Sequence, residues 1–112
     1  MQDKIIPAKV LSIAGSDSSG GAGIQADIKT VTSLGGYAAA AMTALTIQNT
    51  EGVRGVFPVP SATVAEQIAA VMEDIEPQAV KIGMVNDADI VRVISEAIVR
   101  YAPRYVVFDP VM

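Results

Sequence analysis

Short apolar runs alternate along this sequence with stretches that have helical periodicity. The runs cover residues 10–14, 37–47, 79–82 and 105–108. Their length and their β-forming residues are typical of buried strands. Strands joined through helices pair in parallel, and the helices then cover both faces of the sheet. The alternation therefore predicts an α/β fold, a parallel sheet in the order βαβαβαβ with helices on both faces.

Between the runs, apolar residues recur with the spacing of one helix face. They are Ile24, Ile28 and Val31 in the first helix; Val64, Ile68, Val71, Met72 and Ile75 in the second; and Ile90, Ile94, Ala97, Ile98 and Tyr101 in the third. Turn-forming residues are predicted to end these helices, because glycine accepts a left-handed backbone and proline cannot continue a helix. They are Gly35 and Gly36 for the first helix, Pro77 for the second and Pro103 for the third.

Polar residues are expected to cap two of these helices at their starts. Ser61 or Thr63 is the expected cap of the second helix, and Asn86 is the expected cap of the third. The stretch from residue 48 to residue 60 is predicted to be a loop, because glycine and proline recur within it.

Composition limits the chemistry of the chain. It has no Cys and no His, which excludes disulfides, thiolate or imidazole metal ligands, and catalysis by either residue type. Its 8 basic and 12 acidic residues give a net charge of −4, which argues against nucleic acid or an anionic membrane surface as a partner. Since no apolar stretch reaches the ~18 residues of a membrane span and no signal-peptide pattern is present, we expect a cytoplasmic protein.

The predicted sheet ends without a helix to cover its last strand. Only four residues follow residue 108, although parallel strands are normally buried on both faces. Hydrophobic residues make up 51% of the chain, a large share for a small domain that exposes much of its surface. We therefore expect residues 1–112 to be the N-terminal portion of a single, larger domain.

A glycine-rich segment, residues 15–23, joins the first strand to the first helix. Ligands of open α/β sheets bind at the carboxyl ends of the strands, where this segment lies. It is not a Walker A loop, because Gly21 and Ala22 stand where that motif needs Lys and Ser or Thr. Residues 21–26 match the dinucleotide pattern G-x-G-x-x-G/A, but they begin too far beyond the strand and no acid ends the second strand. A dinucleotide-dependent oxidoreductase is thus a competing reading that the spacing does not favour.

Four blocks of sequence are similar to motifs of one enzyme family. Residues 14–27 closely resemble the opening motif of bacterial hydroxymethylpyrimidine/phosphomethylpyrimidine kinases, which belong to the ribokinase superfamily. Residues 43–50, 80–84 and 109–112 match further family blocks in the same order. The resemblance implies a ribokinase-like fold, a homodimer, and phosphorylation of 4-amino-5-hydroxymethyl-2-methylpyrimidine and its monophosphate with ATP and Mg²⁺ in thiamine biosynthesis.

The same resemblance implies which part of the enzyme is present. The family's anion hole, its catalytic base (Asp or Cys) and most of its ATP site lie in a C-terminal half that these residues do not include. We therefore expect no catalytic base within this segment, and no turnover by the 112 residues alone.

The resemblance also assigns roles to single residues. The implied substrate-binding residues are Gly15, Asp27, Gln48, Met84 and Val111. Asp27 and Gln48 would form hydrogen bonds with the aminopyrimidine, and Met84 and Val111 would flank its flat ring. Asp109 is implied to have a role linked to Mg²⁺. Without the resemblance, these side chains would be read as a solvated helix acid, a polar loop residue, core packing and a helix cap.

Two further functions compete with this one. A pyridoxine-type kinase of the same superfamily would share much of the site. A non-catalytic module that binds a small molecule would fit the lack of a catalytic base in the segment.

Overall fold

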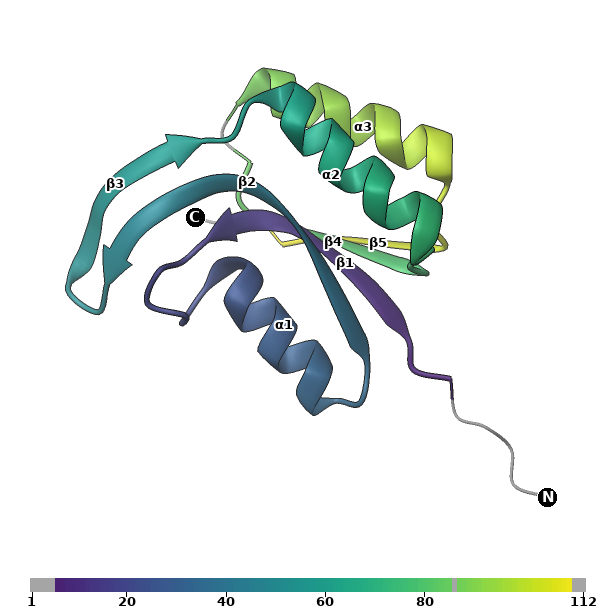
Figure 1. Cartoon of the computed structure of the whole chain (residues 1–112), viewed down its shortest axis with the longest axis horizontal. Helices are drawn as coiled ribbons and strands as arrows, with labels where there is room; N and C mark the ends of the chain where they lie inside the picture. The colour runs from purple at the N-terminus through teal and green to yellow at the C-terminus, as the bar shows by residue number, and fades with distance from the viewer. Residues whose placement is uncertain (1–5, 86, 110–112) are drawn as a thin grey trace.

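The computed structural model describes residues 6–85 and 87–109, which fold into five strands and three helices (Figure 1). In chain order these elements are β1 (Lys9–Ser16), α1 (Gly23–Ser33), β2 (Tyr37–Asn49), β3 (Gly52–Pro58), α2 (Ser61–Asp74), β4 (Ala79–Ile82), α3 (Ala88–Tyr101) and β5 (Tyr105–Phe108). None of these helices is long and apolar enough to cross a membrane, as far as the described residues go.

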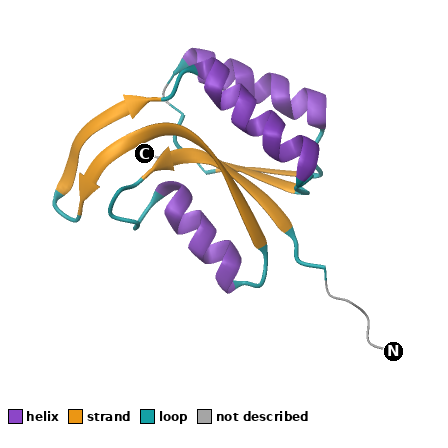
Figure 2. Ribbon diagram, in the orientation of Figure 1, coloured by secondary structure: helices purple, strands orange, loops and turns teal. Residues whose placement is uncertain are grey.

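The strands form a single sheet in the order β3-β2-β1-β4-β5. β1 pairs in parallel with β2 and with β4, and β4 pairs in parallel with β5. One face of the sheet carries α1, and the other carries α2 and α3 (Figures 1 and 2). The predicted α/β class with helices on both faces is confirmed, and the predicted ranges of β4 and β5 match the structure.

The predicted loop over residues 48–60 is wrong, because most of it is a strand. β2 continues to Asn49, whose side-chain oxygen accepts a hydrogen bond from the Glu51 N–H at 2.8 Å in a tight turn. β3 then returns antiparallel to β2, which makes the order βαββαβαβ and the sheet mixed rather than wholly parallel. Glycine and proline suggested a loop, but Gly55 and Pro58 are tolerated because β3 is an edge strand with one unpaired side.

The helix ends are partly as predicted. Gly35 has φ +86 just after α1, as a left-handed glycine should. The predicted Ser61 or Thr63 cap is wrong, because Pro60 is the N-cap of α2 and no side chain caps it. The N-cap of α3 is Asp87, whose carboxylate accepts from the Asp89 N–H; Asn86 lies outside the described residues.

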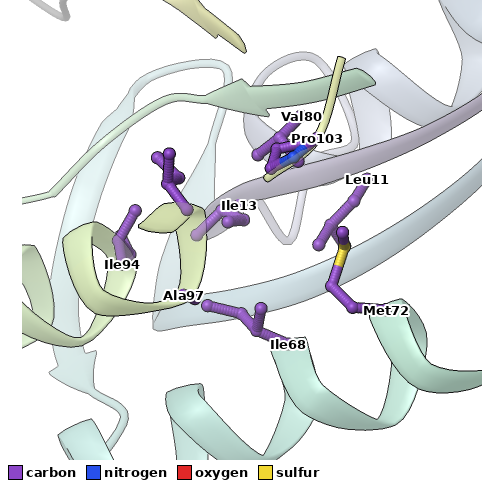
Figure 3. A pocket seen from close by; sticks show the side chains of 9 residues that line it. Leu11, Ile13, Ile68, Met72, Val80, Ile94, Ala97 and Pro103 are labelled. Carbon is purple, nitrogen blue, oxygen red and sulfur yellow. The ribbon is translucent and has the colours of Figure 1, made fainter. Parts of the chain in front are cut away.

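The main core lies between the sheet and the pair α2–α3. The predicted helix stripes supply Val64, Ile68, Met72, Ile90 and Ile94, all of them buried. They pack against residues of β1 and β4 such as Leu11 and Val80. Of the helix residues, Ile68, Met72 and Ile94 line a small apolar pocket in this core (Figure 3). Its free volume is about 10 Å³, roughly the least that accommodates one water molecule, so this layer is closely filled.

The other face of the sheet is more polar. α1 buries only Ile24 of its predicted stripe, while Ile28 is 36% exposed. Beneath α1, the sheet presents Ser12, which is 1% exposed. This face leads to the carboxyl edge of the sheet, where a second, wider cavity lies.

Candidate functional site

A cavity of about 470 Å³ opens at the carboxyl ends of β1, β2 and β4. These strands are parallel, so their carboxyl ends meet at one edge, as in other open α/β sheets that bind ligands. The cavity is lined by the predicted site residues Gly15, Asp27, Gln48, Met84 and Asp109. The remaining predicted site residue, Val111, lies outside the described residues. The fold thus gathers residues spread over most of the sequence into one place.

The glycine-rich loop is organised by Asp17, which is only 4% exposed. Its carboxylate accepts hydrogen bonds from the Ser19 hydroxyl at 2.7 Å, the Ser19 N–H at 2.8 Å and the Gly21 N–H at 3.0 Å. These bonds, that of the Ser19 hydroxyl foremost, lower the pKa of Asp17 below its usual 3.8. In the sequence, Asp17 stands out only as the single acidic residue of the segment 15–23. The family motif includes it without giving it a role of its own.

Gln25 joins this loop to the first turn of α1. Its side-chain oxygen accepts from the Asp17 N–H at 2.8 Å, and its amide nitrogen donates to the Ser16 hydroxyl at 2.7 Å. At the start of α1, Gly23 has φ +61, and a Cβ there would stand 2.1 Å from the Gly15 carbonyl oxygen. Only glycine fits at this position, because both the backbone conformation and the close approach exclude a side chain.

Asp27 is not a solvated helix acid. Its Oδ2 accepts hydrogen bonds from the Ser12 hydroxyl at 2.7 Å and from Lys81 Nζ at 2.9 Å. The side chains of Asp27 and Lys81 are both 22% exposed, so this ion pair is largely withdrawn from water. Lys81 lines the cavity as well, although it is not among the site residues predicted from the sequence.

Gln48 stands at the end of β2 with its backbone fixed and its side chain weakly held. The Ser18 hydroxyl accepts from the Gln48 N–H at 2.7 Å, which joins the glycine-rich loop to β2. The side-chain oxygen of Gln48 lies 3.3 Å from the Thr46 hydroxyl, whose single proton is already donated to the Ser16 carbonyl at 2.6 Å. The amide of Gln48 is therefore able to exchange its weak contact for a ligand.

The missed hairpin contributes a wall of the cavity. Val53 and Val56 of β3 line it, and in the sheet they stand opposite Gln48 and Thr46 of β2. They share a face of the hairpin with those two residues because the register shifts between Ile47 and Gln48, which leaves Arg54 as an extra residue in β3 between the two valines. The wall of the cavity formed by the hairpin thus combines the apolar Val53 and Val56 of β3 with the polar Thr46 and Gln48 of β2.

Asp109 follows β5 and has a side chain that is 68% exposed. Its carboxylate lies 3.9 Å from Lys81 Nζ, and within residues 6–85 and 87–109 no three acidic side chains come together as a metal site would need. The metal-linked role of Asp109 stays a prediction, because Mg²⁺ is often held by one or two carboxylates together with substrate phosphates.

Comparison with known proteins places the chain in a family. The family model described as phosphomethylpyrimidine kinase matches residues 17–112. The hydroxymethylpyrimidine/phosphomethylpyrimidine kinase of Bacillus subtilis is 52% identical over 104 residues, which are 93% of this chain and 38% of that protein. The chain thus spans about two fifths of the length of this relative.

Solved structures agree with this assignment. The crystal structure of phosphomethylpyrimidine kinase from Clostridium difficile superimposes with a TM-score of 0.90 and 53% identity, covering 93% of this chain and 48% of that one. The pyridoxal kinase of Staphylococcus aureus, solved with AMP-PCP and pyridoxal, gives a TM-score of 0.85 at 37% identity over 96% of this chain and 40% of that one. The resemblance seen in the sequence is confirmed, and the chain belongs to the phosphomethylpyrimidine kinase family.

Proposed function

We propose that this chain forms the acceptor-binding part of an ATP-dependent kinase that phosphorylates 4-amino-5-hydroxymethyl-2-methylpyrimidine and its monophosphate in thiamine biosynthesis. The observation that carries the proposal is the cavity of about 470 Å³, which brings together Gly15, Asp27, Gln48, Met84 and Asp109 from separate parts of the sequence. Membership of the family and the name of the Bacillus subtilis relative support the same substrate.

The lining of the cavity suits an amino-substituted aromatic ring. Met84 and the valines of β3 offer apolar surface, and Gly15 lies in the same lining with the end of the Met84 side chain against its backbone. Asp27 accepts hydrogen bonds only, as an exocyclic amino group requires, and the Gln48 amide can donate to a ring nitrogen or accept from the amino group. These contacts would hold the ring and leave its hydroxymethyl group to face the phosphoryl donor.

In the proposed reaction, the hydroxymethyl oxygen bonds to the γ-phosphorus of ATP. The bond from that phosphorus to the β–γ bridging oxygen breaks, ADP leaves, and the hydroxyl proton passes to a base. Two carboxylates of the cavity are already engaged, the buried Asp17 by its loop and the half-buried Asp27 by Lys81. We therefore assign acceptor binding and orientation to this chain, and propose that the base, the anion hole and most of the ATP site come from further residues of one kinase domain. Positioning of this kind supplies much of the rate in phosphoryl transfer.

The proposed use of ATP and the proposed use of Mg²⁺ rest on different evidence. ATP as the donor is supported by the pyridoxal kinase solved with AMP-PCP, an ATP analogue. Mg²⁺ would neutralise charge on the phosphates when bound, and among the described residues Asp109 is the one we propose to act near it. A homodimer and a cytoplasmic location stay predictions.

A pyridoxal-type kinase is the second candidate, because the Staphylococcus aureus pyridoxal kinase has nearly the same backbone over this region. The experiment that decides between the two functions offers the purified protein that carries this sequence either the aminopyrimidine alcohol or pyridoxal, and detects the phosphorylated products by mass spectrometry. We expect mono- and diphosphate products from the aminopyrimidine and a lower kcat/KM with pyridoxal. Preference for pyridoxal would replace the proposed substrate. Binding of the aminopyrimidine without any product in the complete enzyme would favour a non-catalytic binding module.

A further inference from the structure

Lys81 places a charge in the middle of a short apolar strand. It lies in β4 between Val80 and Ile82, which are 2% and 7% exposed. Those two neighbours face the core under α2 and α3, so Lys81 points to the opposite face of the sheet, the face that α1 covers. Its register partner on β1 is Ser12, and Asp27 reaches both from α1.

Stability alone does not account for this cluster. Replacing a largely buried ion pair by well-packed apolar residues is often neutral or stabilising, since the charges lose their hydration when they are buried. Ala79, the other residue of β4 that lies on the same face as Lys81, is apolar. The Ser12–Asp27–Lys81 cluster also borders the cavity, which is lined by Asp27 and by Lys81. Its location points to a role in the site.

The cluster fixes one oxygen of Asp27. Both hydrogen bonds, from the Ser12 hydroxyl and from the Lys81 ammonium, reach Oδ2. One donor would let the carboxylate rotate, whereas two donors from neighbouring strands set its orientation relative to the sheet edge. Within the described residues no hydrogen bond is made to Oδ1, which is therefore the oxygen available to a ligand. Asp109 is the other charge near Lys81, but it lies 3.9 Å away and is mostly exposed, so it holds the ammonium less strongly.

We propose that Lys81 is a positioning residue for acceptor recognition: its ammonium holds Asp27 so that the free carboxylate oxygen receives the amino group of the heterocycle. The inference rests on the proposed function, because it assumes that Asp27 binds the acceptor. Lys81 acts through Asp27 and makes no contact of its own with the ring. It would therefore determine preference for a ring that carries an amino group over the same ring without one.

A double-mutant cycle tests this coupling. The variants are Lys81→Met, Asp27→Asn and the two combined, in the purified protein that carries this sequence. Calorimetry gives the dissociation constant for the aminopyrimidine alcohol and for its analogue with hydrogen in place of the amino group. In each single variant, we expect the dissociation constant for the amino compound to rise about tenfold. The dissociation constant for the analogue should stay almost unchanged. The combined variant should bind no more weakly than Asp27→Asn alone.

Controls separate positioning from a general loss of structure. Lys9→Met removes a lysine at the other end of β1, where its ammonium bonds the Ile75 carbonyl at 3.2 Å, and should leave both constants unchanged. Lys81→Arg keeps the charge and should restore most of the preference for the amino compound. If Lys81→Met does not fold, the combined variant, which leaves no buried carboxylate unpaired, is compared with Asp27→Asn instead.

The outcomes distinguish this inference from the proposed function. If Asp27→Asn weakens binding but Lys81→Met keeps the preference for the amino group, the positioning role is wrong and the proposed function stands. If the combined variant loses affinity for the amino compound by the product of the two single-variant factors, Lys81 acts independently of Asp27 and the inference is again overturned. If the unmodified protein binds neither compound, the proposed function itself fails, and the inference fails with it.

Discussion

The end of the Met84 side chain lies against the backbone of Gly15, so closely that a Cβ on Gly15 would stand 2.7 Å from Met84 Cε. Gly15 is the last residue but one of β1, and Met84 follows β4, so the contact joins two neighbouring strands at the cavity. The atom in conflict is the tip of a flexible side chain, which can move. A methyl group at residue 15 would therefore push Met84 rather than the backbone.

Gly15→Ala should thus change binding more than stability. We expect the melting temperature to fall only slightly, since Met84 can take another rotamer. The displaced side chain and the added methyl group would narrow the space for the ring, and KM for the pyrimidine should rise about tenfold. Steady-state kinetics measure KM for the pyrimidine, and a thermal melt of the same preparation measures the melting temperature. A large loss of stability with an unchanged KM would show that Gly15 serves the fold alone.

Gly23→Ala should have the opposite result, a loss of the fold. A Cβ at Gly23 would lie 2.1 Å from the Gly15 carbonyl oxygen, and this backbone atom cannot move aside without breaking the turn. We expect a loss of more than about 3 kcal/mol in the free energy of unfolding, measured by denaturant titration. Gly35→Ala is the matched control, because Gly35 also has positive φ but has open space around it. Its cost should be about 1 kcal/mol.

These glycines show what the sequence could and could not predict. The glycine-rich segment indicated a ligand loop, but which glycine is indispensable depends on the bridge between Ser16 and Gly23. β4 and β5 were predicted to the residue, because each is a short apolar run between clear helix ends. β3 was missed, since its pairing with β2 is a tertiary contact that overrides the loop tendency of Gly55 and Pro58.

The site shows the same division. The family motifs supplied five residues that the structure places around one cavity. Lys81 was missed because its neighbours made residues 79–82 look like an ordinary buried strand, and only the packing of α1 on the sheet pairs it with Asp27. Asp17 was missed because its partners, the Ser19 hydroxyl and two backbone N–H groups, reach its carboxylate only through the conformation of the loop.

Stability should depend on pH through Asp17. Its folded-state pKa is lowered, chiefly by the Ser19 hydroxyl, from an ordinary value of 3.8. The ionised carboxylate is thus the form that holds the loop, and its contribution is fully present above that ordinary pKa and lost as pH falls through the lowered folded-state value. Denaturant titrations from pH 7 to pH 3 should therefore show Asp17→Asn less stable than the unmodified protein at neutral pH, with the difference shrinking below about pH 4. Asp74→Asn, at an exposed residue, is the control for the loss of one charge. A difference that stays constant with pH would contradict the role of the ionised form.

Gln48→Ala should weaken use of the pyrimidine more than use of ATP. The Gln48 amide has only a weak contact with Thr46 and is available to the ring, while the backbone that Ser18 holds does not depend on the side chain. We expect KM for the pyrimidine to rise about tenfold and KM for ATP to change less than about twofold. Gln48→Glu keeps an acceptor but removes the donor, so it separates the two roles of the amide. Equal changes in both KM values would mean that Gln48 does not act in acceptor binding.

The hairpin that the sequence did not predict gives the last test of the site. Val56 faces the cavity from β3, whereas Phe57 is the next residue and points to the other face of the hairpin, where it is 57% exposed. Val56→Thr keeps the shape of the side chain but adds a hydroxyl on the apolar wall, and should raise KM for the pyrimidine about threefold to tenfold with little change in kcat. Phe57→Leu changes a neighbouring apolar residue on the far face and should leave KM unchanged. If both variants raise KM equally, the hairpin acts on the site only through its general stability, and β3 is not part of the acceptor wall.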